Sequence, residues 1–115
     1  MSKLTIWHNP RCSKSREALK LLEESKQEFT IVKYLDETPS KENLQEILQM
    51  MSVSPREIMR TKEAIYKELD LKNENDDAKL IDAMLKHPKL IERPIIIKEN
   101  AAIVARPPSL VSDFI

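Results

Sequence analysis

Short β-rich apolar runs alternate along the chain with longer segments in which apolar residues recur at helical spacing. Residues 3–7 are rich in β-formers and end at a turn-forming His-Asn-Pro sequence, which predicts a first strand. From Ser13 to about Ser25, apolar residues lie among charged ones at helical spacing, with no Pro or Gly between them. A second β-rich run occupies residues 29–35. The first third of the chain therefore predicts a β-α-β unit.

The middle of the chain predicts a group of helices. Apolar residues at helical spacing follow a Thr-Pro-Ser sequence and mark a helix through residues 40–51. Residues 54–57 combine Ser at a cap position, Pro at the first helical position and Glu at the third, so a short helix holding residues 58–60 should follow. Residues 63–70 predict a polar helix, and residues 76–87 a helix with one apolar face.

The last part predicts a hairpin and a helix. Residues 94–98 and 101–105 are two β-rich runs joined by Glu99-Asn100, which is typical of an antiparallel hairpin with a two-residue turn. A short helix should then begin near residues 106–109 and end near Phe114.

The order β-α-β, helices, β-β-α predicts an α/β fold of the thioredoxin-like type, with a mixed four-stranded sheet and a helical insertion between its two halves. With 115 residues, 41% of them hydrophobic, we expect one domain over residues 1–115, with the insertion at about 40–90. The chain contains no Gly, so its turns should use Pro, Asn, Asp and Ser.

Charge and hydropathy narrow the class of protein. The 19 basic and 19 acidic side chains cancel, so no overall positive field draws the chain onto nucleic acid or an anionic membrane. The first apolar run is too short for a signal peptide, and no run of eighteen apolar residues occurs. We therefore expect a soluble, cytoplasmic protein. Since no heptad seam is present, we expect a monomer.

Cys12 is the residue with the most distinctive setting. A lone cysteine excludes an internal disulfide, and with two distant histidines it makes a poor metal site, so no metal is expected. It lies between the first strand and the first helix, where backbone N–H groups and the helix dipole favour a thiolate. Because a dipole contributes only about 0.3–1 kcal/mol and each pKa unit needs about 1.4 kcal/mol, side chains must supply the rest. Polar and basic neighbours flank it: Arg11, Ser13, Lys14, Ser15 and Arg16.

A free cysteine can also be a small buried hydrophobe, but the polar run around Cys12 favours a functional thiol. Three more arginines are candidate anion ligands: Arg60, Arg93 and Arg106. Each would ordinarily be a solvated surface charge, yet Arg93 and Arg106 both directly precede Pro where an element begins. Pro at a strand start is compatible with a cis Arg93–Pro94 bond, which is our hypothesis here.

Three segments of the sequence resemble the glutaredoxin-dependent arsenate reductase family, closest to its YfgD-like subgroup. The resemblance runs along nearly the whole chain and rests on His8-Asn9-Pro10-Arg11-Cys12-Ser13-Lys14-Ser15-Arg16, Glu92-Arg93-Pro94-Ile95 and Arg106-Pro107. Better-known members carry a small residue before the cysteine and Gly after it, whereas this chain has Arg11 and Ser13 there.

The resemblance implies a thioredoxin-like fold in which Cys12 attacks arsenate or a similar oxyanion and forms a covalent adduct. Glutathione, as co-substrate, then attacks this adduct, and glutaredoxin resolves the mixed disulfide; no cofactor is bound. The oxyanion-binding arginines of the family match Arg60, Arg93 and Arg106. The histidine that the family carries near the cysteine matches His8. From their places beside Cys12 we expect Ser15 and Arg16, together with His8, to support the thiolate. One cysteine per chain agrees with a borrowed second thiol.

Two alternatives remain open at the level of the sequence. The same thiol could reduce a glutathione mixed disulfide or another thiol-reactive compound. The chain could also be a thioredoxin-like transcriptional adaptor, although such redox sensors use a Cys-x-x-Cys pair and this chain has Ser15 at the second position. His8 could lower the pKa of Cys12 when protonated, or it could simply form a hydrogen bond within the loop.

Overall fold

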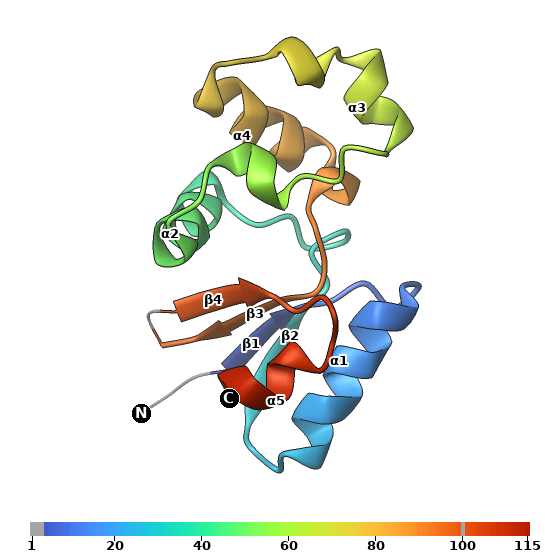
Figure 1. Cartoon of the computed structure of the whole chain (residues 1–115), viewed down its shortest axis with the longest axis vertical. Coiled ribbons are helices and arrows are strands. Elements are labelled where there is room, and N and C mark those ends of the chain that lie inside the picture. Colours follow the sequence, from blue (N-terminus) through green and yellow to red (C-terminus); the bar gives the residue numbers. More distant parts are fainter. Residues whose placement is uncertain (1–3, 100) are drawn as a thin grey trace. The chain divides into compact units, whose positions relative to one another are not determined.

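Four strands form one mixed sheet in the order β2-β1-β3-β4 (Figure 1). Strand β1 (Leu4–Trp7) runs parallel to β2 (Phe29–Val32) and antiparallel to β3 (Ile95–Lys98). Strand β4 (Ala101–Val104) pairs antiparallel with β3 and forms the edge opposite β2. The mixed four-stranded α/β sheet predicted from the sequence is confirmed.

The computed structural model describes residues 4–99 and 101–115, and the chain divides into two units. The sheet unit joins Met1–Glu37 to Arg93–Ile115, and the helical unit spans Thr38–Glu92. The expectation of one domain stays a prediction.

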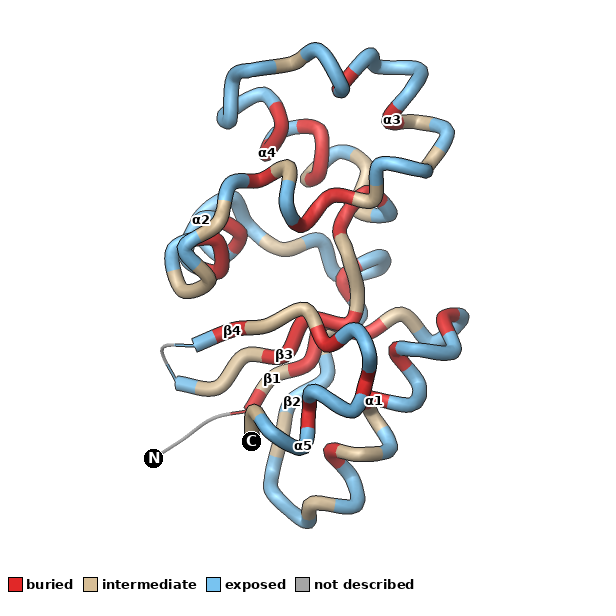
Figure 2. Tube along the Cα trace, viewed as in Figure 1, coloured by how far each residue is buried: buried red, intermediate tan, exposed pale blue. Residues whose placement is uncertain are grey.

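One face of the sheet is covered by helices α1 (Ser13–Glu24) and α5 (Leu110–Phe114), which contact each other (Figure 1). Ile6 and Ile96 are register partners on adjacent strands, and both are fully buried beneath these helices. Burying each such side chain stabilises the fold by about 1.5–3 kcal/mol. The buried part of this core, seen as red tube in Figure 2, comprises Leu4, Ile6, Ala18, Leu22, Ile96, Ala105 and Val111.

Six short helices build the helical unit: α2 (Lys41–Met51), η1 (Pro55–Ile58), α3 (Ala64–Glu68), η2 (Leu71–Asn73), α4 (Asp77–Lys86) and η3 (Pro88–Leu90). The first turns of α2 and α4 are capped by side chains. The hydroxyl of Ser40 accepts a hydrogen bond from the N–H of Asn43 at 3.1 Å, and the carboxylate of Asp76 accepts one from Ala78 at 2.9 Å. Helices α2 and α4 contact each other, which gives this unit its own buried interior.

Two predicted elements are shorter than expected. The second strand stops at Val32 because the chain turns, with the N–H groups of Asp36 and Glu37 both donating to the carbonyl of Lys33. The short helix after Ser54 is a 3₁₀ turn that ends at Ile58, so the prediction that it holds residues 59 and 60 is wrong. Met59 instead leaves the turn in extended conformation and forms a β-bridge with Ile91.

The absence of Gly leaves other residues to adopt the left-handed backbone conformation. Ser52 and Asp70 do so, as the expected turn residues, with φ of 56° and 53°. Lys26 and Glu99 also do so, with φ of 62° and 55°. The expectation that turns use only Pro, Asn, Asp and Ser is therefore wrong, although the predicted place of Glu99 in the hairpin turn is confirmed. Asn100, the other predicted turn residue of the hairpin, lies outside the described residues. Among the described helices, none has the length and apolar character needed to cross a membrane.

Candidate active site

The loop between β1 and α1 presents Cys12 as the N-cap residue of α1. Asn9 shapes this loop: its side-chain carbonyl accepts from the N–H of Arg11 and its backbone carbonyl accepts from the N–H of Cys12, both at 3.0 Å. Cys12 is extended, with φ −98° and ψ 122°, and its own carbonyl accepts the N–H of Arg16, 3.0 Å away, as the first bond of the helix. The thiol therefore faces the N–H groups of the first turn.

Buried polar contacts fasten this loop to the helix. Nδ1 of His8 lies 2.6 Å from Oγ of Ser15, and the N–H of Asn9 donates to the same oxygen at 3.0 Å. The side chains of His8 and Ser15 are buried. On the exposed side, the guanidinium of Arg16 donates to the carbonyl of Pro10 at 2.9 Å. His8, Ser15 and Arg16 thus hold the backbone that carries Cys12.

The pKa of the Cys12 thiol is lowered. Burial is the largest single influence and raises it, because the side chain is only 9% exposed. Against burial act the backbone N–H of Ser15, the positive charge of Arg93, a hydrogen bond from the Arg93 side chain and the backbone N–H of Lys14, and together they outweigh it. The Cys12 side chain forms no capping hydrogen bond with α1, so the N–H groups of Lys14 and Ser15 act on the sulfur as electrostatic partners.

The pKa of His8 is also lowered, first by burial and then by the positive charges of Lys33 and Arg16. Both effects disfavour the imidazolium, so His8 tends toward the neutral form. Of the two roles left open by the sequence, the contact observed is a hydrogen bond within the loop, to Ser15. Lys33 is a neighbour of this site that the sequence did not indicate.

Arg93 and Arg106 lie at the end of the sheet from which the Cys12 loop departs. Trp7, the last residue of β1, is in register with Ile95, and Ile95 with Val104. The pairing continues beyond the strands, where the carbonyl of Pro94 accepts the N–H of Ala105 at 2.9 Å. Both arginine–proline bonds, Arg93–Pro94 and Arg106–Pro107, are cis, in agreement with our hypothesis for the first.

Arg93 and Arg106 differ in exposure. Nε of Arg93 is buried and has no hydrogen-bond partner within the part of the chain that the structure describes, while the same side chain interacts with Cys12. Arg106 is exposed. A buried guanidinium N–H without an acceptor costs free energy and is ordinarily satisfied by a bound group. The geometry around Cys12 therefore offers a free donor beside an activated thiol.

Arg60 belongs to the helical unit. Its backbone N–H donates to the carbonyl of Leu90 at 2.6 Å, next to the bridge between Met59 and Ile91. Its Nε lies 3.6 Å from a carboxylate oxygen of Glu63, and the side chain is 23% exposed. Nε and one terminal nitrogen are buried, and residues 4–99 and 101–115 provide them with no hydrogen-bond partner. Arg60 thus shares with Arg93 the property of unsatisfied buried donors.

Arg56 is an arginine whose role the sequence did not reveal. Its guanidinium donates to the hydroxyl of Tyr66 and to the carbonyls of Leu71, at 2.9 Å, and Glu74. These three acceptors lie 10 to 18 residues away from Arg56 along the chain, so the local sequence around Arg56 does not predict these hydrogen bonds. Arg56 joins parts of the helical unit, and its donors are already occupied.

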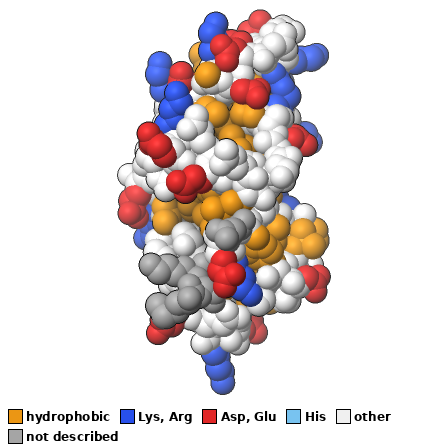
Figure 3. All heavy atoms as spheres, turned by 90° about the vertical axis from the view of Figure 1, so that its left-hand side faces the viewer, with side chains coloured by type: hydrophobic (Ala, Val, Ile, Leu, Met, Phe, Trp, Pro, Cys, Tyr) orange, Lys and Arg blue, Asp and Glu red, His pale blue; other side chains and the backbone are white. Residues whose placement is uncertain are grey.

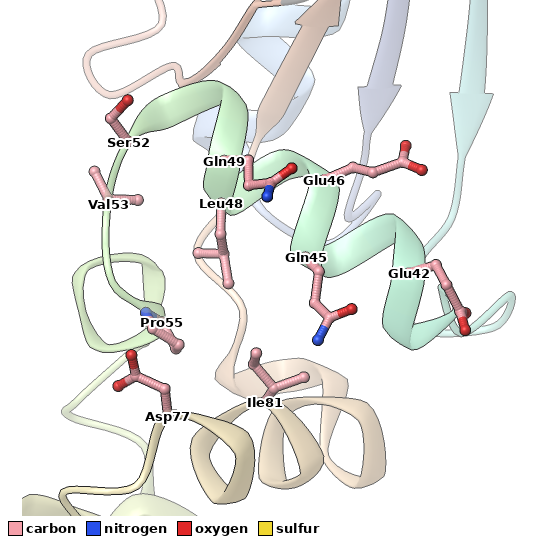
Figure 4. A pocket seen from close by; sticks show the side chains of 10 residues that line it. All are labelled: Glu42, Gln45, Glu46, Leu48, Gln49, Ser52, Val53, Pro55, Asp77 and Ile81. Carbon is pink, nitrogen blue, oxygen red and sulfur yellow. The ribbon is translucent and has the colours of Figure 1, made fainter.

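A large hollow in the helical unit, of about 720 Å³, has the wrong chemistry for an anion (Figure 4). It lies between α2 and α4, and Glu42, Glu46 and Asp77 line it around the apolar side chains of Leu48 and Ile81. Among the described residues, no basic side chain lines it. Over the face shown in Figure 3, acidic and basic side chains are interspersed, in keeping with the balanced net charge. Within residues 4–99 and 101–115, no group of three or more His, Cys, Asp or Glu could hold a metal ion.

Comparison with known proteins gives consistent matches along the chain. Residues 7–114 match the sequence model of the ArsC family. The uncharacterized protein YfgD of Escherichia coli (strain K12) is 44% identical over 112 residues, covering 96% of this chain and 94% of YfgD. An arsenate reductase of Neisseria meningitidis is 47% identical over 109 residues, covering 93% of each chain. The solved structure of an arsenate reductase from Vibrio cholerae superposes with a TM-score of 0.94 at 43% identity, covering 98% of both chains. This likeness confirms the predicted thioredoxin-like fold.

Proposed function

Because the chain belongs to the ArsC family, we propose that it is an arsenate reductase and that Cys12 is its nucleophile. One observation carries the proposal: the thiol of Cys12 has a lowered pKa and lies against the side chain of Arg93, whose buried Nε–H has no acceptor among the residues that the structure describes. A thiolate is the reactive form of cysteine, and an arginine fork matches a tetrahedral oxyanion. Relatives named arsenate reductase are 47% and 38% identical to this chain.

In the first step that we propose, the Cys12 thiolate attacks the arsenic(V) atom of dihydrogen arsenate. A sulfur–arsenic bond forms, one arsenic–oxygen bond breaks, and the departing oxygen leaves as water after taking up a proton. No oxidation occurs in this step. Guanidinium groups offset the charge that gathers on the remaining oxygens.

The three candidate arginines have different places in this proposal. Arg93 is the donor nearest the thiol, because it is the one that interacts with Cys12. Arg106 leaves β4 at the same end of the sheet and is the second donor from the sheet unit. Arg60 supplies the donor of the helical unit, where its guanidinium has unsatisfied buried nitrogens. His8, Ser15 and Arg16 act as positioning residues, since they hold the loop rather than face the oxyanion.

The second step requires a thiol from outside the chain. A glutathione thiolate attacks the Cys12 sulfur of the adduct, a disulfide forms, and the sulfur–arsenic bond breaks with its electron pair going to arsenic. Arsenic is reduced by two electrons and each sulfur is oxidised by one; protonation then releases arsenite. Glutaredoxin reduces the Cys12–glutathione disulfide and restores the thiol. We propose that a monomer carries out this cycle. We place the reaction in the cytoplasm, where glutathione is kept reduced.

The experiment is arsenate-dependent NADPH oxidation with glutathione, glutaredoxin and glutathione reductase present. We expect turnover by the natural protein and none by Cys12→Ser, while Ser13→Ala, which alters an exposed neighbour, keeps it. Arg60→Lys, Arg93→Lys and Arg106→Lys should each lose about tenfold or more, because lysine keeps the charge but not the bidentate fork. Absence of arsenate turnover by a folded protein whose thiol reacts rapidly near neutral pH would overturn the choice of substrate.

A second candidate function, reduction of a glutathione mixed disulfide, has support from the same lowered thiol pKa, since disulfide exchange also needs a thiolate. It does not need oxyanion ligands. Arg60→Lys would therefore leave the reduction of a glutathionylated peptide unchanged while arsenate turnover falls. A transcriptional adaptor has less support, because Ser15 occupies the position of a second cysteine. Its partner binding would survive all three arginine substitutions.

A further inference from the structure

A small charged hollow of about 220 Å³ lies beside the loop that precedes Cys12. It belongs wholly to the sheet unit, and its walls are the loop itself and the turn that follows β2. The lining residues are His8, Asn9, Pro10, Arg11, Lys33, Leu35 and Asp36. Cys12 is the next residue after Arg11, so its Cα lies about 3.8 Å from that of a wall residue. The hollow therefore begins one residue from the nucleophile.

Two cations and one carboxylate line this hollow without neutralising one another. Arg11, Lys33 and Asp36 are exposed, and across residues 4–99 and 101–115 none of them forms an ion pair within 4.0 Å. The turn fixes Lys33 and Asp36 relative to each other, because the carbonyl of Lys33 accepts the N–H of Asp36 at 2.9 Å. Lys33 also acts on the pKa of His8, which places its charge on the loop side of the hollow.

Size and charge together select the ligand. Pockets that hold a whole drug-sized molecule measure about 300–1,000 Å³, so this hollow is suited to one end of a small molecule. A free α-amino acid end carries one carboxylate and one ammonium, for which two cations and one carboxylate are complementary partners. Leu35, 39% exposed, offers an apolar wall to the methylene groups between such an end and the rest of the ligand.

We propose that this hollow binds the α-amino acid end of a γ-glutamyl thiol such as glutathione, with Arg11 and Lys33 on its carboxylate and Asp36 on its ammonium. The inference rests on the proposed function in one respect, namely that a small thiol attacks at Cys12. It adds the part of the protein that recognises this thiol. The thiol group is thereby directed past Arg11 toward the Cys12 sulfur.

The test avoids arsenate. Cys12, the sole cysteine, is first converted to its mixed disulfide with thionitrobenzoate. An incoming thiolate attacks the Cys12 sulfur, a new disulfide forms, and the thionitrobenzoate anion leaves with the electron pair of the broken bond, because it is the better leaving group. Its absorbance gives the second-order rate constant. The quantity compared is the ratio of the rate constants for glutathione and for 2-mercaptoethanol, which lacks an amino acid end.

We expect Arg11→Gln, Lys33→Met and Asp36→Asn each to lower this ratio by about fivefold or more, as loss of a charged contact does. Matched controls are Lys20→Met and Glu37→Gln, which remove the same charges from exposed residues outside the hollow and should leave the ratio unchanged. Glutathione acetylated on its α-amino group should be insensitive to Asp36→Asn. Use of the ratio cancels effects of Lys33 on His8.

An unchanged ratio in all three variants would overturn the proposal. So would an equal fall in the two controls, which would reveal a general charge effect, or equal losses with both thiols, which would locate the effect in the Cys12 disulfide. A protein without arsenate turnover can still show the expected ratios, so failure of the arsenate reductase proposal and failure of this one give different results.

Discussion

Nδ1 of His8 and Oγ of Ser15 lie 2.6 Å apart, one at the exit of β1 and the other in the first turn of α1. The N–H of Asn9 donates to the same hydroxyl oxygen, so one buried serine is bonded to two residues of the loop. This side-chain contact adds to the backbone bonds of Cys12 with Asn9 and Arg16 and ties the loop to the first turn of α1. The arrangement makes Ser15 the residue on which the conformation of the site depends.

Ser15→Ala should therefore destabilise the protein by about 1–3 kcal/mol, because it leaves the buried ring nitrogen of His8 and the N–H of Asn9 without their partner. Urea unfolding followed by circular dichroism measures the loss. Ser13→Ala, at an exposed position of the same helical turn, should cost much less. Equal stability of the two variants would contradict a structural role for the Ser15 hydroxyl.

The lowered pKa of Cys12 should make the stability of the protein depend on pH. The folded chain releases the thiol proton at lower pH than the unfolded chain, whose thiol has the ordinary pKa of about 8.5. Between these two pKa values the unfolded state binds more protons, so the free energy of unfolding rises with pH. The stabilisation is complete above the unfolded pKa and is lost as pH falls through the folded one.

The measurement is the free energy of unfolding of the natural protein minus that of Cys12→Ser, across this pH range. The difference should increase with pH and then level off. In the Arg93→Gln background, the increase of this difference with pH should be smaller. The Arg93 guanidinium lowers the pKa of Cys12 both by its positive charge and by a hydrogen bond. A difference that is flat with pH would mean that the thiol pKa is not lowered in solution.

The arrangement of the sheet could be predicted because each of its strands and helices has a recognisable local sequence pattern. The β-rich run at residues 94–98 and its partner are separated by two residues, and apolar residues recur at helical spacing before and after them. The end of β2 could not be predicted, since Tyr34 and Leu35 continue the β-rich pattern while the turn is set by backbone bonds to Lys33. Likewise, Lys26 gives no signal of a left-handed conformation.

The candidate site was predictable in its residue types but not in its contacts. Cys12 and the two arginine–proline pairs stand out in the sequence because of their neighbours. The lowered pKa of Cys12, however, depends on Arg93, which is 81 positions away and is brought to the same end of the sheet by the pairing of β1 with β3. Arg56 shows the reverse case, because an arginine that looks like a surface charge is a structural residue.

Arg56→Met should destabilise the protein by about 2–4 kcal/mol, since it removes three hydrogen bonds from a charged donor that joins Tyr66, Leu71 and Glu74. Arg56→Lys should recover less than half of this loss, because one ammonium cannot reproduce the planar fork. The comparison is Arg60→Lys, which should cost little stability, because two buried nitrogens of Arg60 have no hydrogen-bond partner among the described residues. Urea unfolding that places Arg56→Lys level with the natural protein would exclude the structural role.

Lys26→Gly should stabilise the protein, although glycine is absent from the entire chain. Lys26 follows the C-cap residue of α1 with φ of 62°, a conformation that costs an L-residue about 1–2 kcal/mol and costs glycine almost nothing. The larger conformational entropy of glycine in the unfolded chain offsets part of this, leaving a net gain of about 0.5–1 kcal/mol. The same change at Lys20, inside α1, should instead destabilise by about 1 kcal/mol. Opposite signs for these two substitutions, measured by thermal and urea unfolding, are expected because only Lys26 has a left-handed backbone; a loss of stability at both positions would contradict this conformation in solution.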